Sequence, residues 1–244
     1  MIKTEGYQTL YRGLIPVLQS CCVSNFVYFY VFHFLKRLRT TSGQSAAQDL
    51  LLGALAGSVN VMSTTPFWVV NTRLKMSGIH KDLPYTNLIA GLKYIAQHEG
   101  ISKLWSGARA GLLLVVNPAI QFSVYEAIKR YLVTIYGTQQ PPVLYFFFLG
   151  AIAKTVSTVL TYPLQLVQTK LRHGDSEFKK NLPPNAGMID ILFQILKNKG
   201  IKGLYQGLEA KIWQTVLTAA LMFMAYEKII RFVKTLLLNS AIKK

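Results

Sequence analysis

Acidic residues are scarce in this sequence, and charged residues of either sign are few. The chain of 244 residues contains 10 Asp and Glu residues against 27 Lys and Arg residues, and charged residues make up 15% of it. Soluble domains usually carry about a quarter charged residues. Together with a hydrophobic content of 51% and a mean hydropathy of +0.30, this deficit argues against a soluble domain and favours a protein of the lipid bilayer.

Cysteine is almost absent as well, and no pattern of reactive residues stands out. Cys21 and Cys22 are adjacent in an apolar stretch, so they do not suggest a disulfide framework, and we interpret them as small buried apolar residues. The four histidines lie apart in sequence without metal-ligand spacing. No nucleophile–base pair or phosphate-cradling glycine loop is recognisable. Catalysis, a metal site and a prosthetic group are therefore not expected.

Long stretches without charge predict spanning helices. Residues 13–35, 50–72 and 131–153 carry no formal charge, and each is long enough to cross a hydrocarbon core, which takes roughly 20 residues of helix. The uncharged windows 110–125 and 212–226 are shorter, but they can still span if the flanking charges face water or headgroups. We expect five spanning helices, at approximately 14–38, 46–73, 108–132, 143–171 and 209–237.

The net charge of +17 also bears on partners. A nucleic-acid-binding protein would gather Lys and Arg on one exposed face. Here the basic residues fall mainly at the ends of the apolar windows, as in Lys36–Arg39, Lys129–Arg130 and Lys228–Lys234. This placement predicts contact with anionic lipid headgroups or with an anionic solute, and no nucleic acid.

A unit of about a hundred residues recurs along the chain. Its best-preserved segments read EGYQTLYRG at 5–13, EGISKLWSG at 99–107 and KGIKGLYQG at 199–207, and their last glycines are 94 and 100 residues apart. A proline segment precedes two of them, as TTPFWVVNTRLK at 64–75 and TYPLQLVQTKLR at 161–172. A third segment follows each one, as FHFLK at 32–36, YEAIK at 125–129 and YEKII at 226–230. Three independent elements with one period indicate tandem repeats.

Each unit reads as a spanning helix with a proline, an amphipathic surface helix and a second spanning helix. Apolar residues at helical spacing predict the surface helices at 85–99 and 187–199, and a glycine closes each one. The aromatic residues Tyr11, Trp105 and Tyr205 are expected at headgroup level. We divide the chain into a shortened first repeat (1–40), a second (46–132), a third (143–237) and a tail (238–244).

These motifs resemble those of the mitochondrial carrier family over the whole chain. The shared pattern is a proline followed by acidic and basic positions, then a surface helix, then an acidic residue and glycine before an aromatic residue. Within the family, peroxisomal members that carry adenine nucleotides in animals are similar in SNFVYFY (24–30), TTPFWVVNTRLK (64–75), NPAIQF (117–122), TYPLQ (161–165) and GLEAKIWQTVLTAALMF (207–223).

The resemblance implies an all-α membrane protein, a pseudo-threefold bundle with five of six transmembrane helices present. It implies an antiporter that exchanges nucleotide-containing cofactors (ATP, ADP, AMP, coenzyme A, FAD or NAD) across the peroxisomal membrane. These cofactors are expected as transported solutes and not as prosthetic groups. The expected partners are the bilayer with its anionic headgroups and a receptor that imports peroxisomal membrane proteins, and the expected state is a monomer. The alternatives are a mitochondrial inner-membrane carrier for another large anion such as NAD, folate or FAD, and a truncated membrane protein that does not transport.

Two gates follow from the resemblance. On the proline side, amides or Trp replace most of the family's charged residues, which predicts a gate with weakened ion pairs. Its residues are Pro66, Trp68, Asn71, Arg73, Pro163, Gln165, Gln168 and Lys170. The opposite gate consists of His33, Lys36, Tyr125, Glu126, Lys129, Tyr226 and Glu227, where His33 departs from the family pattern.

Substrate contacts are predicted within the spanning helices. Most basic residues lie at the ends of the predicted spanning helices, but Lys154 and Lys211 lie within them, where an ammonium group can bind a phosphate. The alternative is that each lysine reaches a lipid headgroup or donates to a backbone carbonyl. Gln214 shares a helix face with Lys211. For the amides of the fourth helix, a purine edge and a neighbouring helix are equally good partners. The amides in question, with two weaker polar positions in the second helix, are Asn117, Gln121, Ser20 and Asn25.

Overall fold

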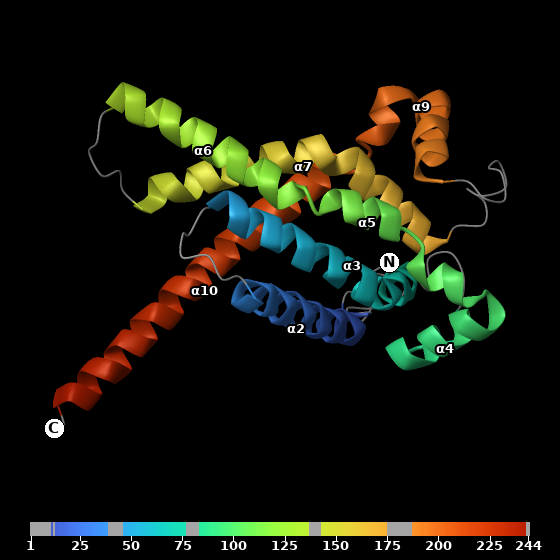
Figure 1. Cartoon of the computed structure of the whole chain (residues 1–244), viewed down its shortest axis with the longest axis horizontal. Coiled ribbons are helices and arrows are strands. Elements are labelled where there is room, and N and C mark those ends of the chain that lie inside the picture. The colour runs from blue at the N-terminus through green and yellow to red at the C-terminus, as the bar shows by residue number, and fades with distance from the viewer. Residues whose placement is uncertain are drawn as a thin grey trace, which may run out of the picture. The chain divides into compact units, whose positions relative to one another are not determined.

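The computed structural model describes residue 11 and residues 13–38, 46–76, 83–136, 143–174 and 187–242. All regular elements within these ranges are helices (Figure 1). In chain order they are α2 (Leu14–Leu38), α3 (Ala46–Met76), α4 (Leu88–His98), η2 (Ile101–Trp105), α5 (Ala108–Leu114), α6 (Asn117–Tyr136), α7 (Val143–His173), α9 (Met188–Leu204) and α10 (Leu208–Ile242).

Four helical segments in the described part of the chain are long and apolar enough to cross a membrane. They are Leu14–Leu38, Ala46–Met76, Ile101–Leu132 and Tyr145–His173. The fifth predicted span, α10, is a continuous helix of 35 residues but is not among these four. Glu209 and Lys211 at one end and Glu227 and Lys228 at the other restrict its uncharged run to residues 212–226.

The chain forms two compact units, which are described separately. Unit 1 comprises Met1–Ala119 and Thr161–Tyr205, and unit 2 comprises Ile120–Leu160 and Gln206–Lys244. Unit 1 therefore holds α2 to α5, the beginning of α6, the C-terminal end of α7, and α9. Unit 2 holds most of α6, the N-terminal part of α7, and α10.

In unit 1, α2 and α3 run side by side (Figure 1). Their polar link is a pair of hydrogen bonds, in which the Ser24 hydroxyl donates to the Asn60 amide oxygen (3.2 Å) and the Asn60 amide nitrogen donates to the Ser24 hydroxyl (3.0 Å). The glycines Gly53 and Gly57 allow close approach, because added Cβ atoms would lie 3.3 Å from the Tyr28 hydroxyl and 3.1 Å from Val115. The GxxxG spacing at these positions is therefore a packing device, as is common between membrane helices.

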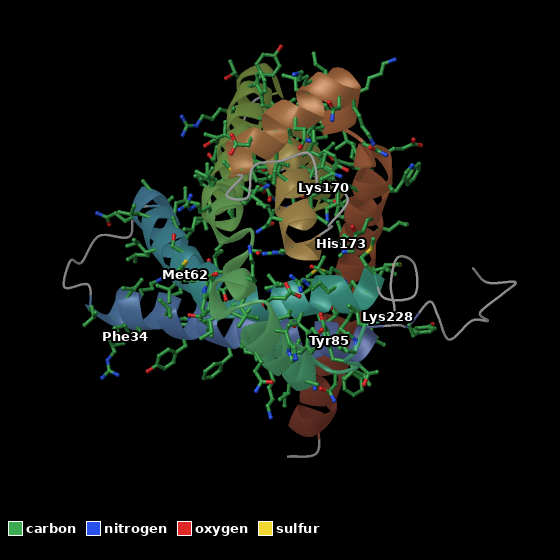
Figure 2. The ribbon with its side chains drawn as sticks, turned by 90° about the vertical axis from the view of Figure 1, so that its right-hand side faces the viewer. Phe34, Met62, Tyr85, Lys170, His173 and Lys228 are labelled. Carbon is green, nitrogen blue, oxygen red and sulfur yellow. The ribbon has the colours of Figure 1, made fainter. Side chains whose placement is uncertain are left out.

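The apolar core of unit 1 lies where the C-terminal half of α3 meets the surface helix α4. It contains Val69, Val70, Leu74, Tyr85, Leu88, Ile95 and Leu104. Figure 2 shows Tyr85 beside the C-terminal part of α3. Because the amphipathic face of α4 is covered by α3, the surface helix is fixed to the helix that precedes it. A smaller cluster of Val167, Ile191 and Ile195 joins α7 to α9 in the same way.

The two surface helices begin and end at the residues that helix-capping rules favour. The Asn87 side chain accepts a hydrogen bond from the Ala90 N–H (2.9 Å) and so caps the N-terminus of α4. Gly100 follows this helix with φ +98°, a backbone conformation that L side chains rarely adopt, which confirms the predicted glycine cap. In the third repeat the backbone of Gly200 is non-helical, with φ 64°, so the surface helix is broken at the glycine that was predicted to close it, and helical geometry resumes beyond this kink to Leu204.

The predicted single helix 108–132 is interrupted, which corrects the sequence prediction. α5 ends at Leu114 and α6 begins at Asn117, with tighter bonds from Val115 N–H to Leu112 and from Val116 N–H to Leu113 between them. The cause is Pro118, which has no N–H to offer the Leu114 carbonyl and which disfavours helical geometry at the preceding residue. As a result, Asn117 stands at a helix start and not within a helix.

The aromatic residues predicted at headgroup level, Trp105 and Tyr205, contact the two long proline-containing helices α3 and α7. Pro66 cannot donate to the carbonyl of Met62, four residues earlier, and the Trp105 indole N–H donates to that oxygen (2.9 Å). In the third repeat, the ring of Tyr205 stacks on that of Tyr162, which precedes Pro163, with centroids 6.2 Å apart. These contacts join each aromatic residue to its own proline segment.

Candidate functional site

Unit 2 contains a cavity of about 440 Å³ between α6, α7 and α10. Its lining is mainly apolar and aromatic, with an ammonium group, an amide and several hydroxyls among the apolar side chains. The lining residues are Gln121, Phe146, Phe147, Gly150, Ala151, Lys154, Thr155, Thr215, Val216, Ala219, Met222 and Tyr226. Three of the predicted site residues, Gln121, Lys154 and Tyr226, are therefore brought to one cavity.

Helical periodicity explains which side chains reach the cavity. On α7 the lining positions run from Phe147 through Gly150 and Ala151 to Lys154, with the three- and four-residue steps that keep side chains on one face. A Cβ atom added at Gly150 would meet no atom within 4 Å, so this glycine leaves open space beside Lys154. The glycine was not recognised as a site residue in the sequence, because it forms no second GxxxG pair.

Two cations dominate the electrostatics of this unit. Lys154 is half-buried in α7, and its ammonium group is repelled by the charge of Lys211 at the beginning of α10. Among the described residues, neither lysine belongs to an ion pair. Two like charges held near each other in a half-buried position are stabilised when an anion binds between or beside them. The arrangement therefore favours a solute with at least one anionic group.

Lys211 and Gln214 form one polar pair on the first turns of α10. The Lys211 ammonium donates to the Gln214 side-chain oxygen over 3.2 Å, which confirms their shared face but places both outside the cavity lining. The Thr215 hydroxyl, which does line the cavity, donates to the Lys211 carbonyl (2.8 Å). Lys211 thus stands one turn from the lining and contributes mainly through its charge.

The predicted substrate residues of unit 1 make hydrogen bonds within the protein. The Ser20 side chain is buried and donates to the Pro16 carbonyl of its own helix (2.7 Å). The Asn25 amide donates to the Cys21 carbonyl (2.9 Å) and lies along an aromatic groove on α2. The Asn117 amide donates to the Thr161 hydroxyl (2.7 Å), which is the interhelical alternative that the sequence left open. None of these three residues is among the residues that line the cavity of unit 2.

On the proline side of the second repeat, the predicted gate residues are buried or half-buried. Pro66 and Asn71 are buried, Trp68 is half-buried, and the Asn71 amide oxygen makes no hydrogen bond among the described residues. Arg73, the remaining cation of this motif, is paired with Glu99 at the end of α4. The same guanidinium also donates to the Arg172 carbonyl (3.4 Å) near the C-terminus of α7.

In the third repeat, amides occupy the corresponding positions. Gln165, two residues after Pro163, donates its amide N–H to the Thr161 hydroxyl (3.0 Å). The Gln168 side chain lies against α5, where its amide nitrogen would be 2.8 Å from a Cβ added at Gly111. Lys170 is near the C-terminal end of α7, one turn before His173 (Figure 2).

On the opposite gate, the described interactions lie within single helices. Glu126 of α6 pairs with Lys129 (3.7 Å) and with Arg130 (3.9 Å), and the Lys129 ammonium lies 6.0 Å from the centre of the Tyr125 ring. On α2, Phe32 makes an edge contact with His33, and the Lys36 ammonium lies over the same ring at 5.9 Å. Tyr226 is exposed and lines the cavity, whereas the side chain of Glu227 lies outside the described part of the structure.

Several lining residues were not predicted from the sequence. They are Phe146, Phe147, Thr155, Thr215 and Met222. A usable signal existed for α10, because Thr215, Ala219, Met222 and Tyr226 follow helical spacing from a predicted gate residue. Phe146 and Phe147 carried no such signal, since an apolar residue in a spanning helix faces lipid as readily as a cavity.

The sequence profile of the mitochondrial carrier protein family matches this chain at residues 42–136 and 139–236. The chain is 47% identical to peroxisomal membrane protein PMP34 of Mus musculus, in an alignment that covers 94% of this chain and 77% of that protein. It is 32% identical to nicotinamide adenine dinucleotide transporter 2, mitochondrial, of Arabidopsis thaliana, with 95% and 65% covered.

A peroxisomal nicotinamide adenine dinucleotide carrier of Arabidopsis thaliana is 31% identical, with 98% of this chain and 83% of that protein covered. Peroxisomal proteins thus stand among the relatives, and the structure has several helices able to span a membrane. A multi-pass protein of the peroxisomal membrane fits both findings. Members of this family are transporters and not enzymes. The two matched segments and the alignments show that the chain belongs to the mitochondrial carrier family.

Proposed function

We propose that this carrier exchanges nucleotide-containing cofactors, one molecule for another, across the peroxisomal membrane. The proposed solutes are ATP, ADP, AMP, coenzyme A, FAD and NAD. The observation that carries the proposal is the position of Lys154. It lines a largely apolar cavity together with Phe146 and Phe147, while a second cation, Lys211, acts on it electrostatically.

The charge of these lysines supports a phosphate-bearing solute. An anion that leaves water for a cavity in a membrane protein loses hydration, and this loss is unfavourable unless cations or hydrogen-bond donors replace it. Lys154 and Lys211 supply two positive charges, and Gln121 adds an amide on the same cavity. A solute with one or more phosphates is therefore favoured over a neutral one of the same size.

The remainder of the lining supports an organic moiety as well as a phosphate. Phe146, Phe147 and Met222 provide apolar surface, against which a planar heterocycle packs favourably. Cavities that hold small molecules usually measure about 300–1,000 Å³, so 440 Å³ suits a nucleotide or part of a dinucleotide. Two relatives are named for nicotinamide adenine dinucleotide, which makes NAD the first solute to test.

Exchange in liposomes tests the proposal directly. The chain is reconstituted into vesicles loaded with NAD, coenzyme A, ATP or buffer, and the uptake of labelled NAD is followed. The proposal expects uptake that depends on an internal nucleotide cofactor and that a dicarboxylate inside the vesicles does not support. No uptake under any loading would overturn transport by this chain and favour a membrane protein that does not transport. Equal uptake into empty and loaded vesicles would overturn the exchange mechanism.

The membrane is tested separately. A tagged chain expressed in cells should colocalise with a peroxisomal membrane marker. Colocalisation with a mitochondrial inner-membrane marker would instead support the alternative of a mitochondrial carrier for a large anion. The liposome result does not depend on this outcome, so the solute and the membrane are decided independently.

A further inference from the structure

Two amides share one buried hydroxyl in unit 1. Both the Asn117 amide (2.7 Å) and the Gln165 amide (3.0 Å) donate to the Thr161 hydroxyl oxygen. Thr161 itself is 5% exposed. One threonine therefore connects a predicted solute contact at the start of α6 with a predicted gate residue that follows Pro163 in α7.

The local backbone allows Asn117 to change partners. The helix is broken at Val115 and Val116, and Pro118 prevents the break from closing into a continuous helix. Asn117 is partly exposed, so packing does not fully enclose this residue. Residues at a helix end make fewer backbone hydrogen bonds than residues within a helix. A movement of Asn117 at this junction therefore disturbs fewer of them.

The same residues stand where the chain passes between the two compact units. Asn117 lies two residues before the chain leaves unit 1, and Thr161 is the residue at which it returns. Tyr205, the last residue before the chain leaves again, stacks on Tyr162. The Asn117–Thr161 hydrogen bond and the tyrosine stack thus tie all three crossing segments together within unit 1.

Among the described residues of the second repeat, the equivalent threonine forms no such link. Thr64 stands two residues before Pro66, as Thr161 stands two residues before Pro163, and it is buried to a similar extent. Its hydroxyl donates to the Asn60 carbonyl of the same helix (2.7 Å), and no second helix is joined through it. The interhelical role is therefore specific to Thr161 among the two described proline segments.

We infer that Thr161 is a positioning residue for transport. While the carrier holds no solute, the Thr161 hydroxyl binds the Asn117 amide, and it releases this amide when the solute binds. The inference rests on the proposed function and on the sequence prediction that Asn117 contacts the solute. A solute must then compete with Thr161 for the amide. Removing the hydroxyl should make binding tighter, whereas removing the amide should make it weaker.

The test compares Thr161→Val, Thr161→Ser and the matched control Thr64→Val in NAD exchange. Thr161→Val should lower KM about threefold, because the solute no longer has to displace the Asn117–Thr161 hydrogen bond, and the net free energy of one hydrogen bond changes an equilibrium by roughly this factor. Thr161→Ser, which keeps the oxygen, and Thr64→Val should retain the wild-type KM. Asn117→Ala should raise KM. A merely structural role would reduce the maximal rate of Thr161→Val through loss of folded protein but would leave KM unchanged.

Amide hydrogen exchange provides a readout that does not depend on transport. The N–H groups of Val115 and Val116 should exchange faster in Thr161→Val than in wild type, and at the wild-type rate in Thr64→Val. An unchanged exchange rate, an unchanged or higher KM in Thr161→Val, or identical behaviour of the Ser and Val variants would overturn the inference. If the wild-type chain moves no nucleotide, the proposed function fails, and the amide exchange rates alone decide whether Thr161 holds the junction.

Discussion

The guanidinium of Arg73 and the carboxylate of Glu99 form a two-point ion pair, with Nη1 2.5 Å from Oε1 and Nη2 3.0 Å from Oε2. It fixes the C-terminal end of α3 to the end of the surface helix α4. The Arg73 side chain is 9% exposed and that of Glu99 is 37% exposed, so a largely buried cation depends on a partner at the protein surface. In the second repeat, the Arg73–Glu99 ion pair therefore joins the spanning helix to the surface helix.

The third repeat has no acidic residue at the position that corresponds to Glu99. The residue that corresponds to Arg73 is Lys170, and the residue that corresponds to Glu99 is Lys199. Two cations cannot form an ion pair with each other. The described apolar cluster between α7 and α9 is that of Val167, Ile191 and Ile195. The two repeats share a fold but differ in how their surface helices are held.

Replacing Glu99 should therefore destabilise the protein. Glu99→Ala removes the carboxylate from the buried Arg73 guanidinium, which keeps the Arg172 carbonyl as an acceptor, and we expect a loss of roughly 2 kcal/mol, less than for a fully buried pair because Glu99 is partly exposed. Thermal unfolding of the protein in detergent micelles measures this loss. Lys93→Ala, which removes a charge from an exposed position on α4, is the matched control and should change the unfolding temperature much less. Equal shifts in both variants would show that the ion pair does not hold α4.

Replacing Trp105 should weaken the proline-containing part of α3. Trp105→Phe removes the donor to the Met62 carbonyl, which Pro66 leaves without its helical partner, and we expect a cost of about 1 kcal/mol. Unfolding temperature and amide exchange in residues 60–66 are the measurements. Tyr205→Phe is the control, because the ring that stacks on Tyr162 is kept. A Trp105→Phe variant as stable as wild type would show that water satisfies the carbonyl equally well.

The phenol of Tyr85 should make stability depend on alkaline pH. Burial raises the pKa of Tyr85 above its ordinary value of about 10, and the nearby charge of Arg73 only partly offsets this. A group with a raised pKa in the folded state contributes stability below its unfolded pKa, and this contribution is lost as the pH rises through the folded value. Unfolding temperatures should therefore fall above pH 10, and Tyr85→Phe should make that fall shallower. The same slope in both proteins would exclude Tyr85 as the cause.

Sequence reasoning located the spanning helices well because uncharged windows determine them directly. Both ends of α2 coincide with the predicted range 14–38, and α3 begins at the predicted residue 46. The break at Val115 and Val116 was missed, although Pro118 indicated an interruption, because hydrophobicity is continuous through it. An uncharged apolar window indicates that a segment lies within the membrane. It does not show where the helix breaks, because the break is caused by the single N–H group that Pro118 lacks.

The site residues were harder to predict for a different physical reason. Lys154 stood out because a cation within an apolar helix is costly to bury. Ser20 and Asn117 were less distinctive, since a polar side chain in a membrane helix needs some partner. The partner of Asn117, the Thr161 hydroxyl, depends on helix packing that no spacing rule encodes, whereas the partner of Ser20 is the Pro16 carbonyl four residues earlier on the same helix. The gate role of Arg73 stays a prediction, and its ion pair with Glu99 at the end of α4 likewise depends on packing that the sequence does not show.

The final prediction concerns the two lysines of unit 2. In NAD exchange, Lys154→Ala and Lys211→Ala should each lower the rate at least tenfold, or about 1.4 kcal/mol, while the protein still inserts into the membrane. The reason is that a phosphate cannot enter a low-dielectric passage unless cations replace its lost hydration. Lys154→Arg should be milder because it keeps the charge, although the planar guanidinium has a different shape beside Gly150.

The matched control is Lys93→Ala, which removes one positive charge from an exposed position on the surface helix α4. It should leave exchange unchanged, since the net charge of the chain is altered equally in all three alanine variants. The two cavity lysines should also differ from each other. Lys154 lines the cavity, so its loss should raise the KM for NAD more than the loss of Lys211, which acts from one turn away. Wild-type rates in both variants at equal membrane abundance would show that the lysines serve only to place the helices in the bilayer.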